Sequence, residues 1–297
     1  MSTRARARRS ELWAAAPWLS GVLVLVAGVV VFPAGYMVWT STRAISPFGV
    51  DRGGAGVANF QHVTALAGLP RVLLNTGVWV VGVVAVTVLV SLGLAQFLNK
   101  AFPGRRLVRL AVIVPWAASV VMTATVVYYG LDPFYGVVNR ALVDIGWLDA
   151  PFGFTKRPVP AFGVAMGVAV FVSLPFTTYT LLAGLQAVPE DLLEAARIDG
   201  AGPVATYRRV VLPLLRPAIA VATLINVINV FNSLPILRTM TGSIPGYDAD
   251  TTTTLIFKLI QVDRHVDTAS ALSVVNFALV LVITLVYVRV ARPMREG

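Results

Sequence analysis

Several residue types are scarce or absent in this chain of 297 residues, and their absence excludes whole classes of protein. There is no cysteine, so neither a disulfide framework nor a thiolate metal site can form. Charged residues make up 13% of the chain, against about 25% in an average soluble domain. Hydrophobic residues make up 57%, and the mean hydropathy is +0.79. This composition excludes a disordered protein and disfavours an ordinary soluble enzyme.

Groups that carry catalysis or bind metals are also few. The two histidines, His62 and His265, lie in different predicted loops without metal-ligand spacing, and each is interpreted as a solvated loop residue. Asp248 and Asp250, beside four threonines, resemble a cation site in composition, but they too are interpreted as part of a solvated loop. No Gly-Lys pair occurs, so the chain lacks a phosphate-binding loop. We expect no metal site, no cofactor in this chain and no enzymatic activity.

Long uncharged runs are what the sequence has in abundance. A helix needs about 20 mainly apolar residues to cross a bilayer, and six stretches of at least 21 residues contain no Asp, Glu, Lys or Arg. A cleaved signal peptide is the alternative for the first stretch, but no clean cleavage site follows its long apolar run. The sequence therefore predicts a single all-α transmembrane domain over residues 1–297. Its spans are expected at about 13–39, 72–98, 110–131, 160–186, 217–237 and 269–289.

The distribution of charge predicts the orientation of these spans. With both termini inside, the inner segments hold 15 basic and six acidic residues, and the outer segments hold nine basic and eight acidic residues. Inner loops of membrane proteins carry the excess of Lys and Arg, so both termini are predicted to be cytoplasmic. The net charge of +10 then reflects topology, and nucleic acid is not expected as a partner.

The loop over residues 187–216, AVPEDLLEAARIDGAGPVATYRRVVLPLLR, predicts a pair of short helices on the cytoplasmic side. Pro189 suits a first helical turn, and Gly200 suits a helix end in the left-handed conformation. Pro203 suits the start of a second helix, which Leu212-Pro213 is expected to stop. Such a helix-turn-helix is either a docking element or a connector that lies on the lipid headgroups.

The spacing within this loop resembles the EAA loop of ABC importer permeases. Glu194-Ala195-Ala196, three residues, Gly200, nine residues and then Val210-x-Leu212-Pro213 match that motif. In the family the loop fits a cleft on an ATP-hydrolysing subunit and carries its closure into the membrane. The resemblance implies that the ATPase-docking residues are Glu194, Ala195, Ala196, Asp199, Gly200, Leu212 and Pro213.

Further matches resemble the carbohydrate branch of these permeases, of the maltose and glycerol-phosphate type. They are Asn75-Thr76, Ser91 to Ala95, Gly104-Arg105-Arg106-x-x-Arg109, Pro115-Trp116 and Leu185-x-x-Val188-Pro189-Glu190-Asp191. One departure is Pro235, which stands where relatives often carry an acidic residue, so the end of span five is expected to be kinked.

The resemblance implies a six-helix, type I importer permease in the bacterial cytoplasmic membrane that moves a sugar or sugar-like solute. It also implies four kinds of partner: a second, homologous permease, two copies of a cytoplasmic ATPase subunit that binds ATP and Mg, an extracytoplasmic solute-binding protein, and the lipid bilayer.

Asn226, Asn229 and Asn232 in span five are the candidates for the substrate path, because amides hydrogen-bond sugar hydroxyls. The alternative for them is hydrogen bonding between helices. For the whole protein the alternatives are a stand-alone secondary carrier or channel, an importer permease for a non-sugar solute, and a membrane scaffold. The absence of Asp, Glu, Lys and Arg inside the spans argues against an ion-coupled carrier.

Overall fold

The structure is a computed structural model that describes residues 19–291. The four arginines before the first predicted span, the first residues of that span and the last six residues of the chain lie outside this range. The chain divides into two compact units, one formed by the segments up to Leu66 and from Ile256 to Val275, the other by Ala67–Leu255 and the segment from Asn276. The helices α14 (Thr252–Gln261) and α15 (Val266–Ala291) each contribute residues to both units.

The first unit begins with a helix over Leu19–Ser41 that contains a π-helical turn, η1 (Ala27–Val31), followed by α2 (Phe32–Ser41). Pro33 follows the turn and has no N–H, so a regular helical bond to the carbonyl of Val29 is impossible there. The wider turn, in which the Phe32 N–H bonds the Ala27 carbonyl, accommodates this loss. An antiparallel hairpin of β1 (Arg43–Ile45) and β2 (Asp51–Gly54) and the helix α3 (Ala58–Ala65) complete the segment.

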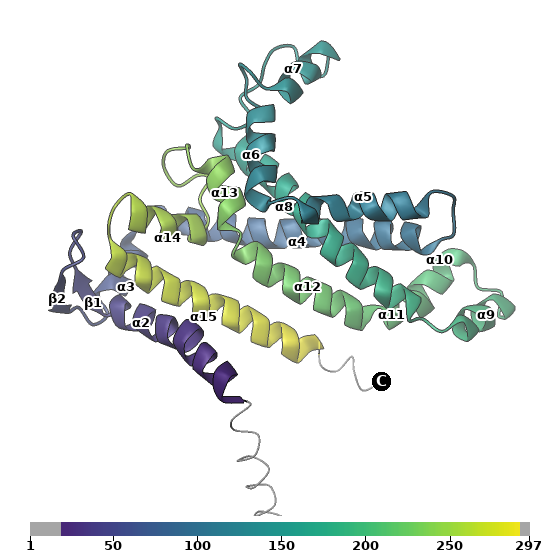
Figure 1. Cartoon of the computed structure of the whole chain (residues 1–297), viewed down its shortest axis with the longest axis horizontal. Helices are drawn as coiled ribbons and strands as arrows, with labels where there is room; N and C mark the ends of the chain where they lie inside the picture. The colour runs from purple at the N-terminus through teal and green to yellow at the C-terminus, as the bar shows by residue number, and fades with distance from the viewer. Residues whose placement is uncertain (1–18, 292–297) are drawn as a thin grey trace, which may run out of the picture. The chain divides into compact units, whose positions relative to one another are not determined.

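Three long helices form the centre of the second unit and lie side by side in Figure 1: α4 (Leu69–Asn99), α8 (Pro158–Gln186) and α12 (Arg216–Phe231). Trp79 of α4 is buried against Phe162 of α8, with ring centroids 5.6 Å apart. The indole Nε1–H of Trp79 donates to the carbonyl oxygen of Val230 at 2.9 Å. This bond satisfies one of the carbonyls that the end of α12 leaves without a helical partner.

The third predicted span is not one continuous helix. Over 110–131 the sequence predicts a single crossing, but α5 (Arg105–Ala117) and α6 (Val120–Gly130) meet at 93°. Ala118 and Ser119 between them are extended, with ψ of 143° and 133°. Pro115, which has no N–H, removes a helical hydrogen bond in the last turn of α5 and favours an end there. The connection to α8 contains the short helix α7 (Val137–Asp144).

The fifth predicted span, over 217–237, is also interrupted. The helix α12 ends at Phe231, and α13 (Leu234–Thr241) begins after Asn232 and Ser233, with Pro235 in its first turn. Proline is favoured in a first turn because its missing N–H has no helical partner there. The kink expected from Pro235 therefore takes the form of a break between two helices.

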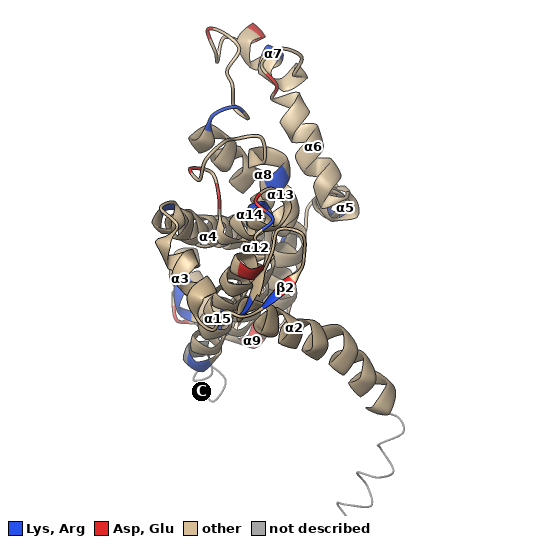
Figure 2. Cartoon of the chain, turned by 90° about the vertical axis from the view of Figure 1, so that its left-hand side faces the viewer, with Lys and Arg blue, Asp and Glu red and all other residues tan. Residues whose placement is uncertain are grey.

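Four described helices are long and apolar enough to cross a membrane, and there are six candidate spans if each bent helix pair counts as one. The bent pairs are α5 with α6, and residues 203–214 with α12. Figure 2 shows that the long helices carry few charged residues, which gather at helix ends and in the connections. The mostly helical fold agrees with the predicted class of all-α membrane protein.

Candidate functional site

The predicted docking residues lie on a pair of short helices between α8 and α12, as the sequence indicates. The first is α9 (Glu190–Ile198). Its first turn carries Glu190 and Asp191, and its last turn carries Arg197. These charges oppose the helix dipole at each end and so stabilise a helix of only nine residues.

Gly200 ends α9 in a left-handed conformation with φ of +76°. The N–H of Ala201 donates to the carbonyl of Ala196 at 2.9 Å, and the N–H of Gly200 donates to that of Arg197 at 3.0 Å. This pair of bonds is a Schellman motif, which satisfies the last carbonyls of the helix. Residues with a Cβ rarely adopt such a φ, so the sequence requires glycine here for a local reason.

The second helix extends further than the sequence predicts. Leu212-Pro213 was expected to stop it, but residues 203–214 form α10 (Pro203–Thr206), the π-helical turn η2 (Tyr207–Val211) and α11 (Leu212–Leu214). The N–H of Leu212 bonds the carbonyl of Tyr207, which lets the helix bypass the donor that Pro213 lacks. The 64° bend to α12 comes after Leu214, where Pro217 removes a further donor.

One side of the helix pair packs on the ends of the long helices. Ala196, Val211 and Leu215 are buried, and Leu193 and Tyr207 pack against the same cluster. The other members of that cluster come from α4, α8 and α12: Ala95, Leu98, Leu181, Leu182, Leu185 and Ala222. The apolar side chains of α9 are divided between its two sides: Leu193 and Ala196 face this cluster, whereas Leu192 and Ile198 are exposed.

The opposite side of the helix pair is exposed and has both polar and apolar side chains. Glu194, Ala195, Asp199 and Gly200 are all exposed. Ile198, one turn after Glu194, is 86% exposed, and Val204 of the second helix is 71% exposed. Within the described residues the Glu194 carboxylate has no hydrogen bond or ion pair. The exposed residues Glu194, Ile198, Gly200 and Val204, called here the loop surface, thus combine a free carboxylate with exposed apolar side chains.

A close contact joins the two helices on either side of this loop. A Cβ on Gly184 of α8 would lie 2.6 Å from the Cβ of Ala218 in α12 and 3.0 Å from a methyl group of Leu215. Only glycine allows α8 and the start of α12 to approach so closely. The sequence does not distinguish Gly184 from the other glycines, because nothing in their spacing shows which of them meets another helix.

The three asparagines proposed for the substrate path do not share one surface. Asn226 is 3% exposed, and its Nδ2 donates to Thr177 Oγ1 of α8 at 2.7 Å and to the Ala222 carbonyl at 2.8 Å. Asn229 and Asn232 are exposed. Asn226 therefore makes the helix–helix hydrogen bond that was the alternative for this group. Thr177, its partner, was not identified from the sequence.

The two acidic residues interpreted as a solvated loop differ from each other. Asp248 is exposed, but Asp250 is buried at 1%, so the interpretation was wrong for Asp250. Asn75 of α4 anchors this segment by donating to the carbonyls of Asp248 at 3.0 Å and Asp250 at 2.9 Å. Within residues 19–291 no group of three or more His, Asp or Glu side chains is placed to hold a metal ion.

Comparisons with known proteins identify relatives over almost the whole chain. The model of a family described as the binding-protein-dependent transport system inner membrane component matches residues 87–295. A probable ABC transporter permease protein of Brucella suis is 35% identical over 91% of this chain and 93% of its own length. The trehalose/maltose transport system permease protein MalF of Thermococcus litoralis is 30% identical, over 94% of this chain and 92% of its own.

A third relative and a solved structure extend this likeness. The sn-glycerol-3-phosphate transport system permease protein UgpA of Yersinia pestis is 29% identical, over 92% of this chain and 93% of its own length. A chain of a bacterial ABC transporter involved in the import of the acidic polysaccharide alginate has the same fold, with a TM-score of 0.82 at 22% identity. That match covers 99% of this chain and 100% of the other.

Proposed function

Because this chain belongs to the family of binding-protein-dependent transport system inner membrane components, multi-pass permeases of ABC importers, we propose that it couples ATP hydrolysis on a partner subunit to solute import through its EAA loop. The observation that carries the proposal is the loop surface. It combines an unpaired carboxylate, Glu194, with exposed Ile198 and Val204 on two helices whose other side is packed. An exposed apolar surface beside a free charge is characteristic of a docking site.

The packing beneath the loop surface supports a mechanical role. Leu193 and Ala196 of α9 contact the same cluster as Leu185 of α8 and Leu215 at the start of α12. Closely packed interiors transmit displacement because they have little free volume. When the ATPase subunits close, their push on α9 is therefore delivered to α8 and α12 together. These two helices then change their tilt and alternate the access of the solute site.

The partners follow from the family. The assembly would contain a second homologous permease, two ATPase copies that bind ATP and Mg, and an extracytoplasmic solute-binding protein. One solved relative is an alginate transporter in complex with a periplasmic protein that holds an alginate pentasaccharide, which supports the last of these. The helix over Leu19–Ser41 has mostly exposed side chains, which suits contact with lipid or with the second permease. The excess of basic residues in the inner segments supports cytoplasmic termini.

The transported solute is proposed to be a sugar or a sugar-like polyol. The relatives described above belong to transport systems for trehalose and maltose and for sn-glycerol-3-phosphate, and a further relative belongs to one for sulfoquinovosyl glycerol. Each of these solutes carries at least two hydroxyl groups. Amides can donate to and accept from such hydroxyls. Asn229 and Asn232 are exposed and remain proposed for this contact, whereas Asn226 already donates both its amide hydrogens within the protein.

The coupling role is tested with Glu194→Ala in the complete transporter. We expect solute-stimulated ATP hydrolysis and uptake to fall about tenfold, because the loop surface loses its unpaired carboxylate. Asp144→Ala removes an exposed carboxylate from α7, far along the chain from the loop, and is the matched control. Wild-type uptake and ATPase copurification in the Glu194→Ala variant would refute the docking role.

The alternatives have different signatures. A stand-alone carrier or channel would support uptake by this chain alone in ATP-free vesicles under an ion gradient. A scaffold without a substrate path would leave the ATPase rate of the reconstituted complex unaffected by any solute. The proposed importer predicts the opposite result in both measurements.

A further inference from the structure

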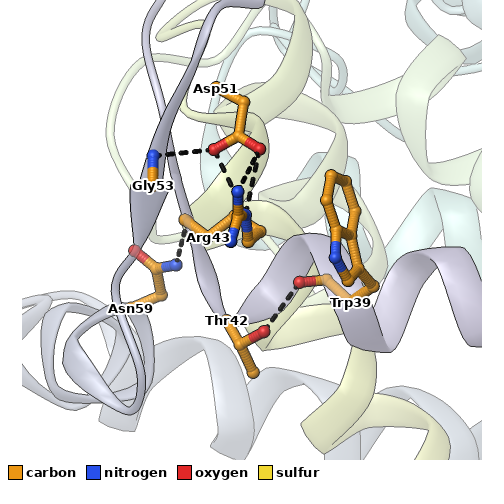
Figure 3. Close-up of polar contacts among 6 residues, drawn as sticks. All are labelled: Trp39, Thr42, Arg43, Asp51, Gly53 and Asn59. Carbon is orange, nitrogen blue, oxygen red and sulfur yellow. Dashed lines mark hydrogen bonds and ion pairs between the residues drawn. The ribbon is translucent and has the colours of Figure 1, made fainter.

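Side chains from the hairpin and from α3 hold the β-hairpin of the first unit in place. Figure 3 shows the guanidinium of Arg43 bonded to the carboxylate of Asp51 at 2.6 Å. The same guanidinium lies 5.1 Å from the ring centroid of Trp39. Asn59 of α3 donates to the carbonyls of Ser41 at 2.9 Å and Arg43 at 2.8 Å, which ties the hairpin to α3. The hairpin is therefore a preformed element, and the charge of Arg43 is already paired.

Beside the hairpin is a pocket of about 440 Å³ that brings together both histidines of the chain. Arg52 comes from β2, His62 from α3, and His265 from the residue before α15. The apolar part of its wall includes Ile45, Pro47, Leu66 and Leu259. His62 and His265 are 203 positions apart, so the sequence alone gave no sign that they meet.

The unpaired groups in this pocket are basic. Within the described part of the chain, the side chains of Arg52, His62 and His265 have no hydrogen-bond or ion-pair partner. Asp267 is the one acidic residue that lines the pocket, and its carboxylate is engaged. It accepts from the Ile45 N–H at 3.1 Å and from the Thr268 N–H at 2.7 Å.

The hairpin that carries Arg52 also exposes apolar side chains to solvent. Phe48 at its tip is 85% exposed, and Val50 is 60% exposed. Arginine together with exposed aromatic and other apolar side chains is typical of protein interfaces. A soluble anion would require only the basic groups, whereas the exposed apolar side chains of the same hairpin indicate a protein partner.

We propose that this pocket, with Arg52, His62 and His265, receives an acidic side chain of the extracytoplasmic solute-binding protein. The inference rests on the proposed function, which places the hairpin and the start of α15 outside the membrane. The aliphatic stem of a Glu side chain fits the apolar wall while its carboxylate faces the basic groups. Phe48 and Val50, on the same hairpin as Arg52, contact the surrounding surface of the partner.

The test measures the affinity of the reconstituted transporter in lipid nanodiscs for its solute-binding protein at constant ionic strength. Arg52→Gln is expected to weaken binding about tenfold, because the pocket loses its guanidinium. The double variant His62→Ala, His265→Ala removes both imidazole N–H donors from the pocket and is also expected to weaken binding about tenfold. Arg140→Gln removes an exposed basic residue from α7 and should bind like the wild type.

Two further results separate the possible failures. If the binding protein docks but neither the Arg52 nor the histidine variant changes its affinity, the pocket is not the docking site and the inference is wrong. If free glutamate binds the pocket while docking is unaffected by these variants, the ligand is a soluble carboxylate, which also overturns the inference. If no solute-binding protein or ATPase associates with the wild-type chain at all, the proposed function itself fails.

Discussion

The contact between Gly184 and Ala218 gives a sharp test of the mechanical path from the loop into the membrane. A Cβ added at Gly184 would lie 2.6 Å from the Ala218 Cβ, about 1 Å closer than carbon atoms normally approach. The Leu215 methyl group, at 3.0 Å, can move aside because it ends a flexible side chain. The Cβ of Ala218 is bonded directly to the backbone of α12 and cannot rotate away, so α8 and α12 must separate. Overpacking of this kind costs about 1–3 kcal/mol.

We therefore expect Gly184→Ala to lower the thermal stability of the purified complex and to reduce solute uptake for each ATP hydrolysed. The compensating substitution is Ala218→Gly, which removes the opposing Cβ. Alone it should cost about 1 kcal/mol through the lower helix propensity of glycine. Combined with Gly184→Ala it should restore the helix spacing and most of the coupling.

The measurements are the melting temperature of the complex and the ratio of uptake to ATP hydrolysis for the four members of this cycle. An additive double variant, less stable and less coupled than either single variant, would refute the contact as the structure places it. Normal coupling in Gly184→Ala with reduced stability would refute the proposed path while leaving the contact intact.

Three other predictions concern the loop, span five and the hairpin. Gly200→Ala should destabilise the end of α9 by about 1–2 kcal/mol and weaken ATPase association, because alanine disfavours a left-handed φ. Gly200→Asn should have a smaller effect because asparagine tolerates that φ, and pull-down of the ATPase subunit measures the difference between the two variants. Asn226→Ala should lower thermal stability because Thr177 and α12 lose a shared hydrogen bond, whereas Asn229→Ala should leave stability unchanged and raise the KM for solute; melting curves and uptake kinetics separate the two. The hydrogen bonds from Arg43 and then from the Gly53 N–H hold the pKa of Asp51 below its usual value of 3.8. The contribution of the Arg43–Asp51 pair to the stability of the hairpin is therefore complete above pH 3.8 and is lost as the pH falls through the lowered pKa. Hydrogen exchange of the hairpin amides across this range measures the loss, which Arg43→Gln should move to higher pH.

The positions of the membrane helices could be predicted from composition, because a bilayer requires long uncharged runs and the loops collect the charges. The breaks within them were harder to predict. Pro175 lies inside α8 without ending it, whereas the helix around Pro115 ends two residues later. A missing N–H weakens a helix equally at both positions, and packing against neighbouring helices decides whether the helix continues. Local sequence does not contain that information.

In the candidate site, too, local features could be predicted from the sequence, whereas contacts between distant residues could not. Gly200 and the ends of α9 follow from rules that act within six residues, so the motif alone located them. The partners of Asn226 and Trp79 lie 49 and 151 positions away, and no periodicity relates them. The substrate-path prediction therefore grouped three asparagines by spacing along one helix, although burial of one face of α12 separates Asn226 from the other two.

The Schellman end of α9 and the buried residues beneath it together determine how stiff the coupling element is. If Gly200 only closed a turn, the helix could pivot about Ala201 and Gly202, and a push on the loop surface would be lost in that motion. The Ala201 N–H bonds the carbonyl of Ala196, a residue that is itself buried in the cluster shared with α8 and α12. This hydrogen bond therefore ties the exposed end of α9 to a residue that packs against α8 and α12.

We expect Ala196→Leu, which enlarges a buried side chain in that cluster, to uncouple ATP hydrolysis from uptake while Glu194 and the rest of the loop surface remain intact. Retained coupling in that variant, with the ATPase still bound, would mean that the force enters the membrane by another route.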